Sequence, residues 1–175
     1  MAAPESSNPN PARSDRPSVV GVGTDDGAAL RDARTIATRI AADEAAADAA
    51  RSQYASSGVP AIEPGSGYAR VARSDEPLHA VRHSAILERG PTDGNEPLLR
   101  GGTLYLTSRR LLHVGVETTD VPLGEIDEMV VALERLVLIR LRDGSDLAVE
   151  VDQPRLLRVQ IAGVIAATRA AAGPS

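Results

Sequence analysis

Two short apolar segments near the C-terminus, residues 136–142 and 146–151, most constrain what this chain can fold into. Alternate residues of each segment are apolar: Val137, Ile139 and Leu141 in the first, and Leu147, Val149 and Val151 in the second. A period of two is the pattern of a β-strand with one buried face. Asp143-Gly144 between them predicts a tight turn, because Gly accepts the positive φ that such turns need. The sequence therefore predicts an antiparallel hairpin here.

Five more strand-like segments precede this hairpin, so the predicted sheet has seven strands. They fall near residues 78–87, 102–107, 110–116, 118–123 and 128–133. A helix is predicted to begin near Pro154, because Pro at a helix start sacrifices no internal hydrogen bond. Asp152 suits the positive end of that helix dipole. Leu157 and Ile161 recur at helical spacing and should pack against the sheet.

Composition divides the rest of the chain into three zones before a folded domain at residues 76–172. Residues 1–26 are rich in Pro, Ser, Asn and Asp and are predicted to be a disordered arm, since they offer little apolar surface to offset ordering entropy. Residues 27–55 are dominated by Ala, contain no Pro, and predict a separate N-terminal helix. Residues 56–75 return to Ser, Gly and Pro and predict a flexible linker.

The segment from Gly102 to Gly115 carries a resemblance to a known family. An apolar strand ends in Leu106-Thr107, is followed by Arg109-Arg110-Leu111, and precedes Val121-Pro122-Leu123. This resembles GRAM and bacterial pleckstrin-homology-like domains, over about residues 73–171. The resemblance implies a mainly β fold, a seven-stranded barrel capped by a C-terminal helix, that acts in recognition. Eukaryotic pleckstrin-homology domains usually carry a Trp in that helix; this chain has none, which favours the GRAM-like or bacterial branch.

Six residues are candidate contacts to a ligand or partner: Arg89, Leu98, Leu99, Arg100, Arg109 and Arg110. Arg109 and Arg110 lie in the turn between the second and third predicted strands. The planar fork of Arg suits phosphate and other anions. The alternative is a solvated turn kept for structural reasons.

The loop from Arg89 to Arg100 lies, by the resemblance, where lipid-binding pleckstrin-homology domains hold inositol phosphates. Asp93 and Glu96 within this loop offset its positive charge, so a strongly cationic cup is not expected. Leu98 and Leu99 would insert at a membrane surface or a partner groove, or else pack the loop onto the barrel rim.

The sequence predicts no cofactor, no metal site and no enzymatic activity. His79 and His83 lie four residues apart and, with His113, have the residue type of metal ligands, but no ligand signature surrounds them and the chain has no Cys. Solvent-facing or edge-strand histidines are the expected case. No spacing of Asp, Glu and His predicts a paired acid and base.

Charge and hydropathy narrow the function. The net charge of -5 argues against nucleic acid as a partner, which needs a basic surface. No secretory signal is visible, and no apolar run approaches the ~18 residues of a membrane span. All 19 basic residues are Arg, a bias typical of GC-rich bacterial genomes. We therefore expect a bacterial, cytoplasmic protein, free or peripheral at the inner face of the membrane.

The predicted function is a non-enzymatic recognition or assembly module that binds a partner protein or a second copy of itself. The alternative is a peripheral membrane protein that binds anionic lipid headgroups. The Ala-rich helix at residues 27–55 bears on this choice. Its narrow apolar stripe, with Ile36 and Ile40 one turn apart, would pair with another protein or leave the helix as a solvated tail. Docking onto the domain is left open.

Overall fold

The computed structural model describes residues 26–71, 73, 75–88 and 98–173. The predicted arm at residues 1–25 therefore lies outside the described residues. The elements in chain order are α1 (Asp26–Ser57), η1 (Tyr68–Arg70), β1 (Leu78–Glu88), β2 (Leu98–Thr107), β3 (Arg110–Val114), β4 (Thr118–Pro122), η2 (Leu123–Glu125), β5 (Ile126–Ala132), β6 (Leu136–Leu141), β7 (Asp146–Val151) and α2 (Pro154–Ala172).

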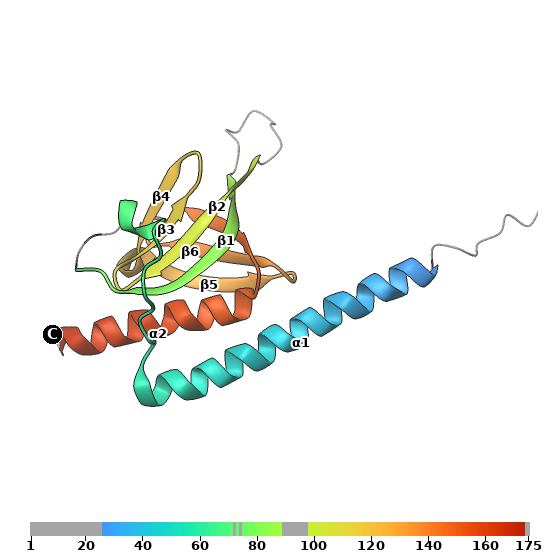
Figure 1. The fold of residues 1–175 in the computed structure, drawn as a ribbon, viewed down its shortest axis with the longest axis horizontal. Helices are drawn as coiled ribbons and strands as arrows, with labels where there is room; N and C mark the ends of the chain where they lie inside the picture. The colour runs from blue at the N-terminus through green and yellow to red at the C-terminus, as the bar shows by residue number, and fades with distance from the viewer. Residues whose placement is uncertain (1–25, 72, 74, 89–97, 174–175) are drawn as a thin grey trace, which may run out of the picture.

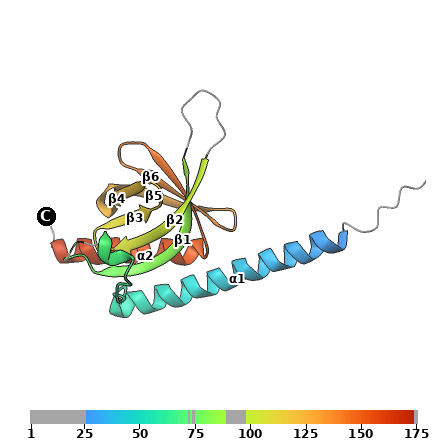
Figure 2. The ribbon, with the colours of Figure 1, turned by 45° about the horizontal axis from the view of Figure 1, so that its top comes forward.

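The seven strands form one antiparallel sheet in the order β4-β3-β2-β1-β7-β6-β5. β1 pairs with β2 along its whole length but with β7 only through residues 84–87, so it joins the two halves of the sheet. Figures 1 and 2 show the curved sheet lying over α2. The predicted seven strands followed by a C-terminal helix are confirmed. β2 begins at Leu98 rather than at Gly102, which shortens the predicted loop from its C-terminal end.

The β6–β7 hairpin forms where the sequence predicts it. Gly144 has a φ of 85°, the left-handed region that residues with a Cβ rarely adopt. Its amide donates to the Leu141 carbonyl at 2.9 Å, and the Ser145 amide donates to Asp143 Oδ1 at 2.8 Å. The Asp143 carboxylate thus stabilises the turn from its own side chain.

The main core lies between the concave face of the sheet and α2. Leu157 and Ile161 of α2 are 1% and 0% exposed. They belong to one buried cluster with residues of five strands: Ile86, Leu104, Leu106, Leu111, Val137, Ile139, Val149 and Val151. The core contains no aromatic side chain, so branched aliphatic residues fill it.

A second, smaller cluster lies on the opposite face of the sheet and includes part of the segment predicted as a flexible linker, residues 56–75. Tyr68, in the segment predicted as a flexible linker, is 3% exposed and stacks obliquely on Tyr105 with ring centroids 5.3 Å apart. The Ile62 amide also donates to the Leu78 carbonyl at 2.7 Å. Ile62 and Tyr68 therefore attach parts of this segment to β1 and β2. Its Ser-, Gly- and Pro-rich composition describes its turns but not the single Tyr that anchors it.

α1 is docked over only part of its length. Its 32 residues span about 48 Å. The second half packs on α2 through Asp43, Ala47 and Ala50, all buried, while residues 28–39 are exposed. Figure 1 shows this first half projecting past the sheet. Within the described part of the chain, neither helix is long and apolar enough to cross a membrane.

Candidate functional site

The residues predicted to contact a ligand do not gather into one site. Arg89 lies outside the described residues, and so do the side chains of Leu98 and Leu99 at the start of β2. Arg100 is half-buried on β2, and its Nη1 lies 2.9 Å from Glu117 Oε2. Its positive charge is therefore already offset by a neighbouring carboxylate.

Arg109 lies in the β2–β3 turn and Arg110 is the first residue of β3, and the two side chains have different partners. Arg109 is exposed and pairs with Asp75 at 2.7 Å. Arg110 was expected on the surface and is instead 7% exposed. Its Nε donates to Glu76 Oε2 at 2.9 Å, and its Nη1 to Asp120 Oδ2 at 2.5 Å. The correction follows from the strand register, which turns Arg110 toward the face covered by residues 68–76.

Electrostatics confirm that Arg110 belongs to the scaffold. Burial alone would lower the pKa of this guanidinium, but the hydrogen bonds and charges of Asp120 and Glu76 outweigh burial, and the net pKa is raised. Its Nη2 also donates to the Val71 carbonyl at 3.3 Å. Arg110 thus fastens the segment before β1 to β4 and has little capacity left for a ligand.

Thr107 explains the Leu-Thr part of the motif. Its side chain is fully buried, and its Oγ1 accepts from the Arg109 amide at 3.2 Å and the Arg110 amide at 3.0 Å. The same hydroxyl donates to the Arg110 carbonyl at 3.0 Å. One side chain therefore satisfies three backbone groups at the β2–β3 turn, a structural role rather than a binding one.

The histidines do not form a metal centre. His79 Nδ1 lies 3.1 Å from the Pro60 carbonyl, and His83 is exposed. His113 is 2% exposed on the core side of β3, where burial lowers its pKa. Among the residues that the structure describes, no three His, Cys, Asp or Glu side chains lie together in a way that would hold a metal ion.

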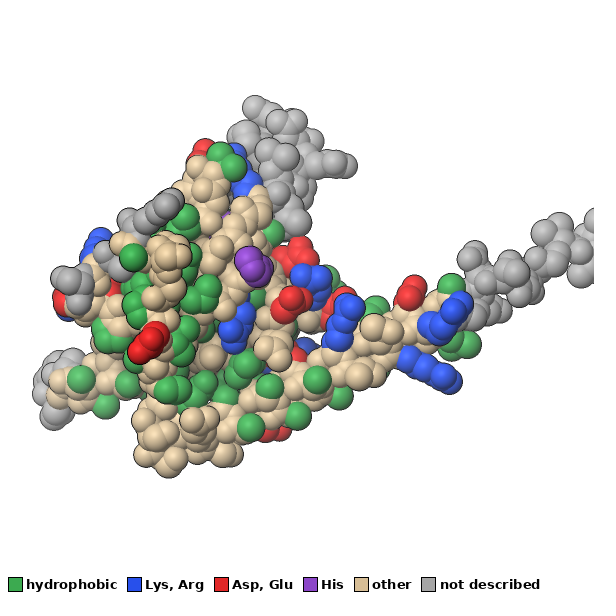
Figure 3. All heavy atoms as spheres, viewed as in Figure 1, with side chains coloured by type: hydrophobic (Ala, Val, Ile, Leu, Met, Phe, Trp, Pro, Cys, Tyr) green, Lys and Arg blue, Asp and Glu red, His purple; other side chains and the backbone are tan. Residues whose placement is uncertain are grey.

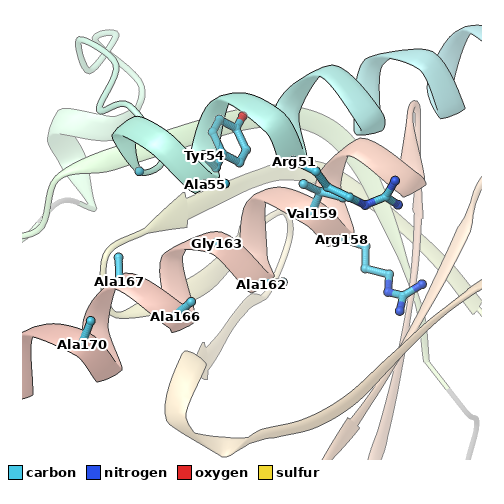
Figure 4. Close-up of a pocket in the computed structure, with 11 residues that line it drawn as sticks. Arg51, Tyr54, Ala55, Arg158, Val159, Ala162, Gly163, Ala166, Ala167 and Ala170 are labelled. Atoms are coloured by element: carbon cyan, nitrogen blue, oxygen red, sulfur yellow. The ribbon is translucent and has the colours of Figure 1, made fainter.

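A groove lies between α1 and α2, which the sequence did not predict. It has a volume of about 570 Å³. Small and apolar residues line it, among them Tyr54 and Ala55 of α1 and Ala162, Gly163, Ala166 and Ala170 of α2. Figure 4 shows Arg51 and Arg158 at one end and Ala170 toward the other. We call this feature the α1–α2 groove.

Two contacts hold the helices in the position that forms the groove. A Cβ on Gly163 would lie 2.6 Å from Val59 Cγ2, so only Gly lets α2 approach the chain after α1 this closely. At the other end, Asp43 of α1 caps α2. Its carboxylate accepts from the amides of Arg155 at 2.9 Å and Leu156 at 3.0 Å.

Asp43 caps α2, whereas the sequence analysis expected only that Asp152 would suit the positive end of the helix dipole. The residue before α2, Gln153, has a φ of 56° and makes no side-chain cap hydrogen bond. Asp152 instead lies 3.2 Å from Arg135 in an exposed ion pair. The first amides of a helix need an acceptor, and here it comes from a residue more than a hundred positions earlier.

Replacing Asp43 with Ala should therefore weaken both the α2 start and the docking of α1. We expect a loss of about 0.5–2 kcal/mol in the free energy of unfolding, the range for removing a helix cap. Urea denaturation measures it. Asp48→Ala is the matched control, because Asp48 is exposed and pairs only with Arg51 of its own helix. Equal losses in the two variants would contradict the capping role.

The sheet order and the closing helix define a pleckstrin-homology-like fold. No protein-family model matches the sequence, and no curated protein matches it. Among solved structures, it is similar to the C-terminal domain of an unknown protein from Leishmania infantum, with 15% identity over 50% of this chain and 85% of that one, at a TM-score of 0.42. It is also similar to the N-terminal PH domain of the human ARAP2 protein, with 10% identity over 55% and 84% and a TM-score of 0.41. At these identities the similarity concerns the fold and not the ligand.

Proposed function

We propose that this protein is a non-enzymatic recognition module of the GRAM-like type that binds a helix of a partner protein in the α1–α2 groove. The observation that supports it is an open groove of about 570 Å³, lined mostly by Ala and Gly, with Arg51 and Arg158 at one end. Helix-in-groove binding is a recurring mode of protein recognition. The distance between packed helices depends on the side chains at the contact, so a small-residue lining favours a close-packed third helix.

Charge specifies the chemistry of that partner helix. Arg51 at the groove end already pairs with Asp48. Arg158 is exposed, and the structure describes no ion pair for it. A partner helix that presents an apolar face of small residues, with one Asp or Glu toward Arg158, would complement the groove.

The groove does not have the residues of an active site. Its titratable lining consists of Arg51, Tyr54 and Arg158. The lining holds no carboxylate and no His, the groups that most often act as general acid or base near neutral pH. This supports a binding role over a catalytic one.

The lipid alternative finds less support in the described residues. Arg100 and Arg109 each lie beside a carboxylate, and Arg110 is buried in ion pairs. A cationic surface for anionic lipid needs several uncompensated basic residues, each contributing about 1 kcal/mol. We propose a cytoplasmic location, as expected from the sequence.

A photo-crosslinking residue at Ala166, inside the groove, tests the proposal in cells. We expect one dominant adduct, because a specific helix would contact this position. The same probe at Ala45, on the opposite face of α1, is the matched control and should give none. Ala162→Arg should abolish the Ala166 adduct by filling the groove. With the purified partner, Arg158→Glu should weaken binding by roughly tenfold in calorimetry, and a partner Asp/Glu→Arg change should restore it.

A second experiment tests the lipid alternative by sedimenting the protein with vesicles that contain anionic lipid, at physiological salt. The protein should remain in the supernatant. Absence of an Ala166 adduct, or co-sedimentation that Arg109→Ala reduces, would overturn the proposal in favour of the lipid-binding function.

A further inference from the structure

The docked face of α1 continues beyond the domain. Docking uses Asp43, Ala47, Ala50 and Tyr54, which recur three or four residues apart and so form one stripe along the helix. The same spacing extended toward the N-terminus reaches four apolar residues: Ile40, Ile36, Ala33 and Ala29. We call these four residues the free stripe.

The free stripe is exposed except at Ile40, which is half-buried. Ile36 is 39% exposed, and Ala29 and Ala33 are also exposed. Figure 3 shows this half of α1 standing clear of the domain, with Arg and hydrophobic side chains on its surface. A helix that projects without tertiary contacts is marginal on its own, because most helical stability in proteins comes from packing.

We propose that a second copy of this chain covers the free stripe, with the two α1 extensions antiparallel about a two-fold axis between Arg34 and Thr35. In that register Ile36 of one copy faces Ala33 of the other, and Ile40 faces Ala29. Each large side chain meets a small one at every level of the stripe. This self-association uses the free stripe and does not depend on the binding proposed for the α1–α2 groove.

Charge selects the antiparallel direction. Asp32 and Arg39 lie seven residues apart and flank the free stripe on the same side, and the structure describes no ion pair for either. In an antiparallel two-fold pair, each flank faces the same flank of the other copy. Helical side chains lean toward the N-terminus, so the Arg39 guanidinium comes level with Asp32 of the second copy. Two symmetric ion pairs result.

The remaining charges and the neighbouring surface fit this register. Arg31 and Arg34 lie on the far face of the helix by their spacing, so the two-fold axis does not bring them together. The start of the second α1 reaches a crevice of about 480 Å³ between α1 and the β5–β6 turn. Glu134 Oε2, buried there, has no hydrogen-bond partner among the described residues.

Sedimentation equilibrium over a concentration series tests the proposal with the full chain. We expect a monomer–dimer equilibrium that Ile36→Asp weakens by roughly tenfold or more, because it buries a carboxylate between the helices. Leu30→Asp is the matched control. Leu30 is 62% exposed, more than Ile36, but lies off the stripe, so its variant should dimerise like the parent protein. Circular dichroism should show both variants folded, since neither residue contacts the core.

A charge swap tests the ion pairs. Arg39→Asp and Asp32→Arg should each weaken the dimer, and the double variant should restore it, because the two charges then meet in exchanged positions. Disulfide cross-linking determines whether the two α1 helices are antiparallel. The chain has no native Cys, so only the introduced Cys residues can react. Ala29→Cys chains mixed with Ile40→Cys chains should cross-link, and neither should do so alone. A monomer at every concentration, equal effects of Ile36→Asp and Leu30→Asp, or cross-linking of Ala29→Cys with itself would overturn the proposal.

Discussion

Replacing Arg110 with Ala should lower the free energy of unfolding by about 3–5 kcal/mol, the cost of removing one partner of a buried ion pair. The Glu76 side chain is 0% exposed and the Arg110 side chain 9%. Without Arg110, the Glu76 carboxylate would keep only Arg73, whose Nη1 lies 3.7 Å away. An uncompensated buried charge costs more than the attraction of the pair contributes, so the loss should be large. Urea denaturation followed by circular dichroism measures it.

Arg109→Ala is the matched control for this prediction, because Arg109 is the adjacent residue and pairs with Asp75 at the surface. Its loss should be about 0–1 kcal/mol, as for other exposed ion pairs. Glu76→Ala combined with Arg110→Ala should cost less than the sum of the single changes, since both remove the same interaction. Similar losses for Arg109→Ala and Arg110→Ala would show that the buried network does not anchor the segment before β1.

Replacing Ile161 with Ala should cost about 2–5 kcal/mol, the range for a fully buried aliphatic side chain cut back to Ala. Ile161 is 0% exposed and lies in the centre of the contact between α2 and the sheet. The spread of the estimate reflects how far the surrounding side chains close the cavity. Thermal or urea unfolding measures the change.

Two further variants separate packing from helix propensity. Ile161→Val removes one methyl group and should cost about 0.5–1.5 kcal/mol. Ile36→Ala makes the same change as Ile161→Ala but on the α1 extension, outside the core, and should shift the free energy of unfolding by no more than about 0.5 kcal/mol under monomeric conditions. Equal losses for Ile161→Ala and Ile36→Ala would mean that α2 does not close the core as described.

Local sequence patterns were sufficient to predict the last two strands, β6 and β7, and the C-terminal helix α2. Asp143-Gly144 lies in a turn between β6 and β7, and α2 begins at Pro154, as predicted. Periodicity, turn chemistry and helix-start residues act within a few positions of the chain, so the sequence carries them directly. The seven strands with a C-terminal helix followed from such patterns together with the family resemblance.

The same reasoning failed where a residue's role depends on distant partners. Arg109 and Arg110 are adjacent residues of the same type, and the sequence analysis assigned both the same candidate role as ligand contacts. The register of β3 against β4 places Asp120 beside Arg110, and the packing of Tyr68 brings Glu76 to it. Burial of the second Arg therefore could not be predicted from its surroundings in the chain.

The α1–α2 groove shows most directly which features follow from the sequence and which follow from the tertiary structure. An Ala-rich composition is enough to make residues 26–57 helical, because Ala has the highest intrinsic propensity. The position of that helix depends on Asp43, which caps α2, and on Gly163, which admits Val59. Neither contact has a local signal, since capping and close approach act across whatever elements the folded chain brings together. The sequence by itself determined the helix, and only the tertiary structure decided which of its faces is buried and which half is left exposed.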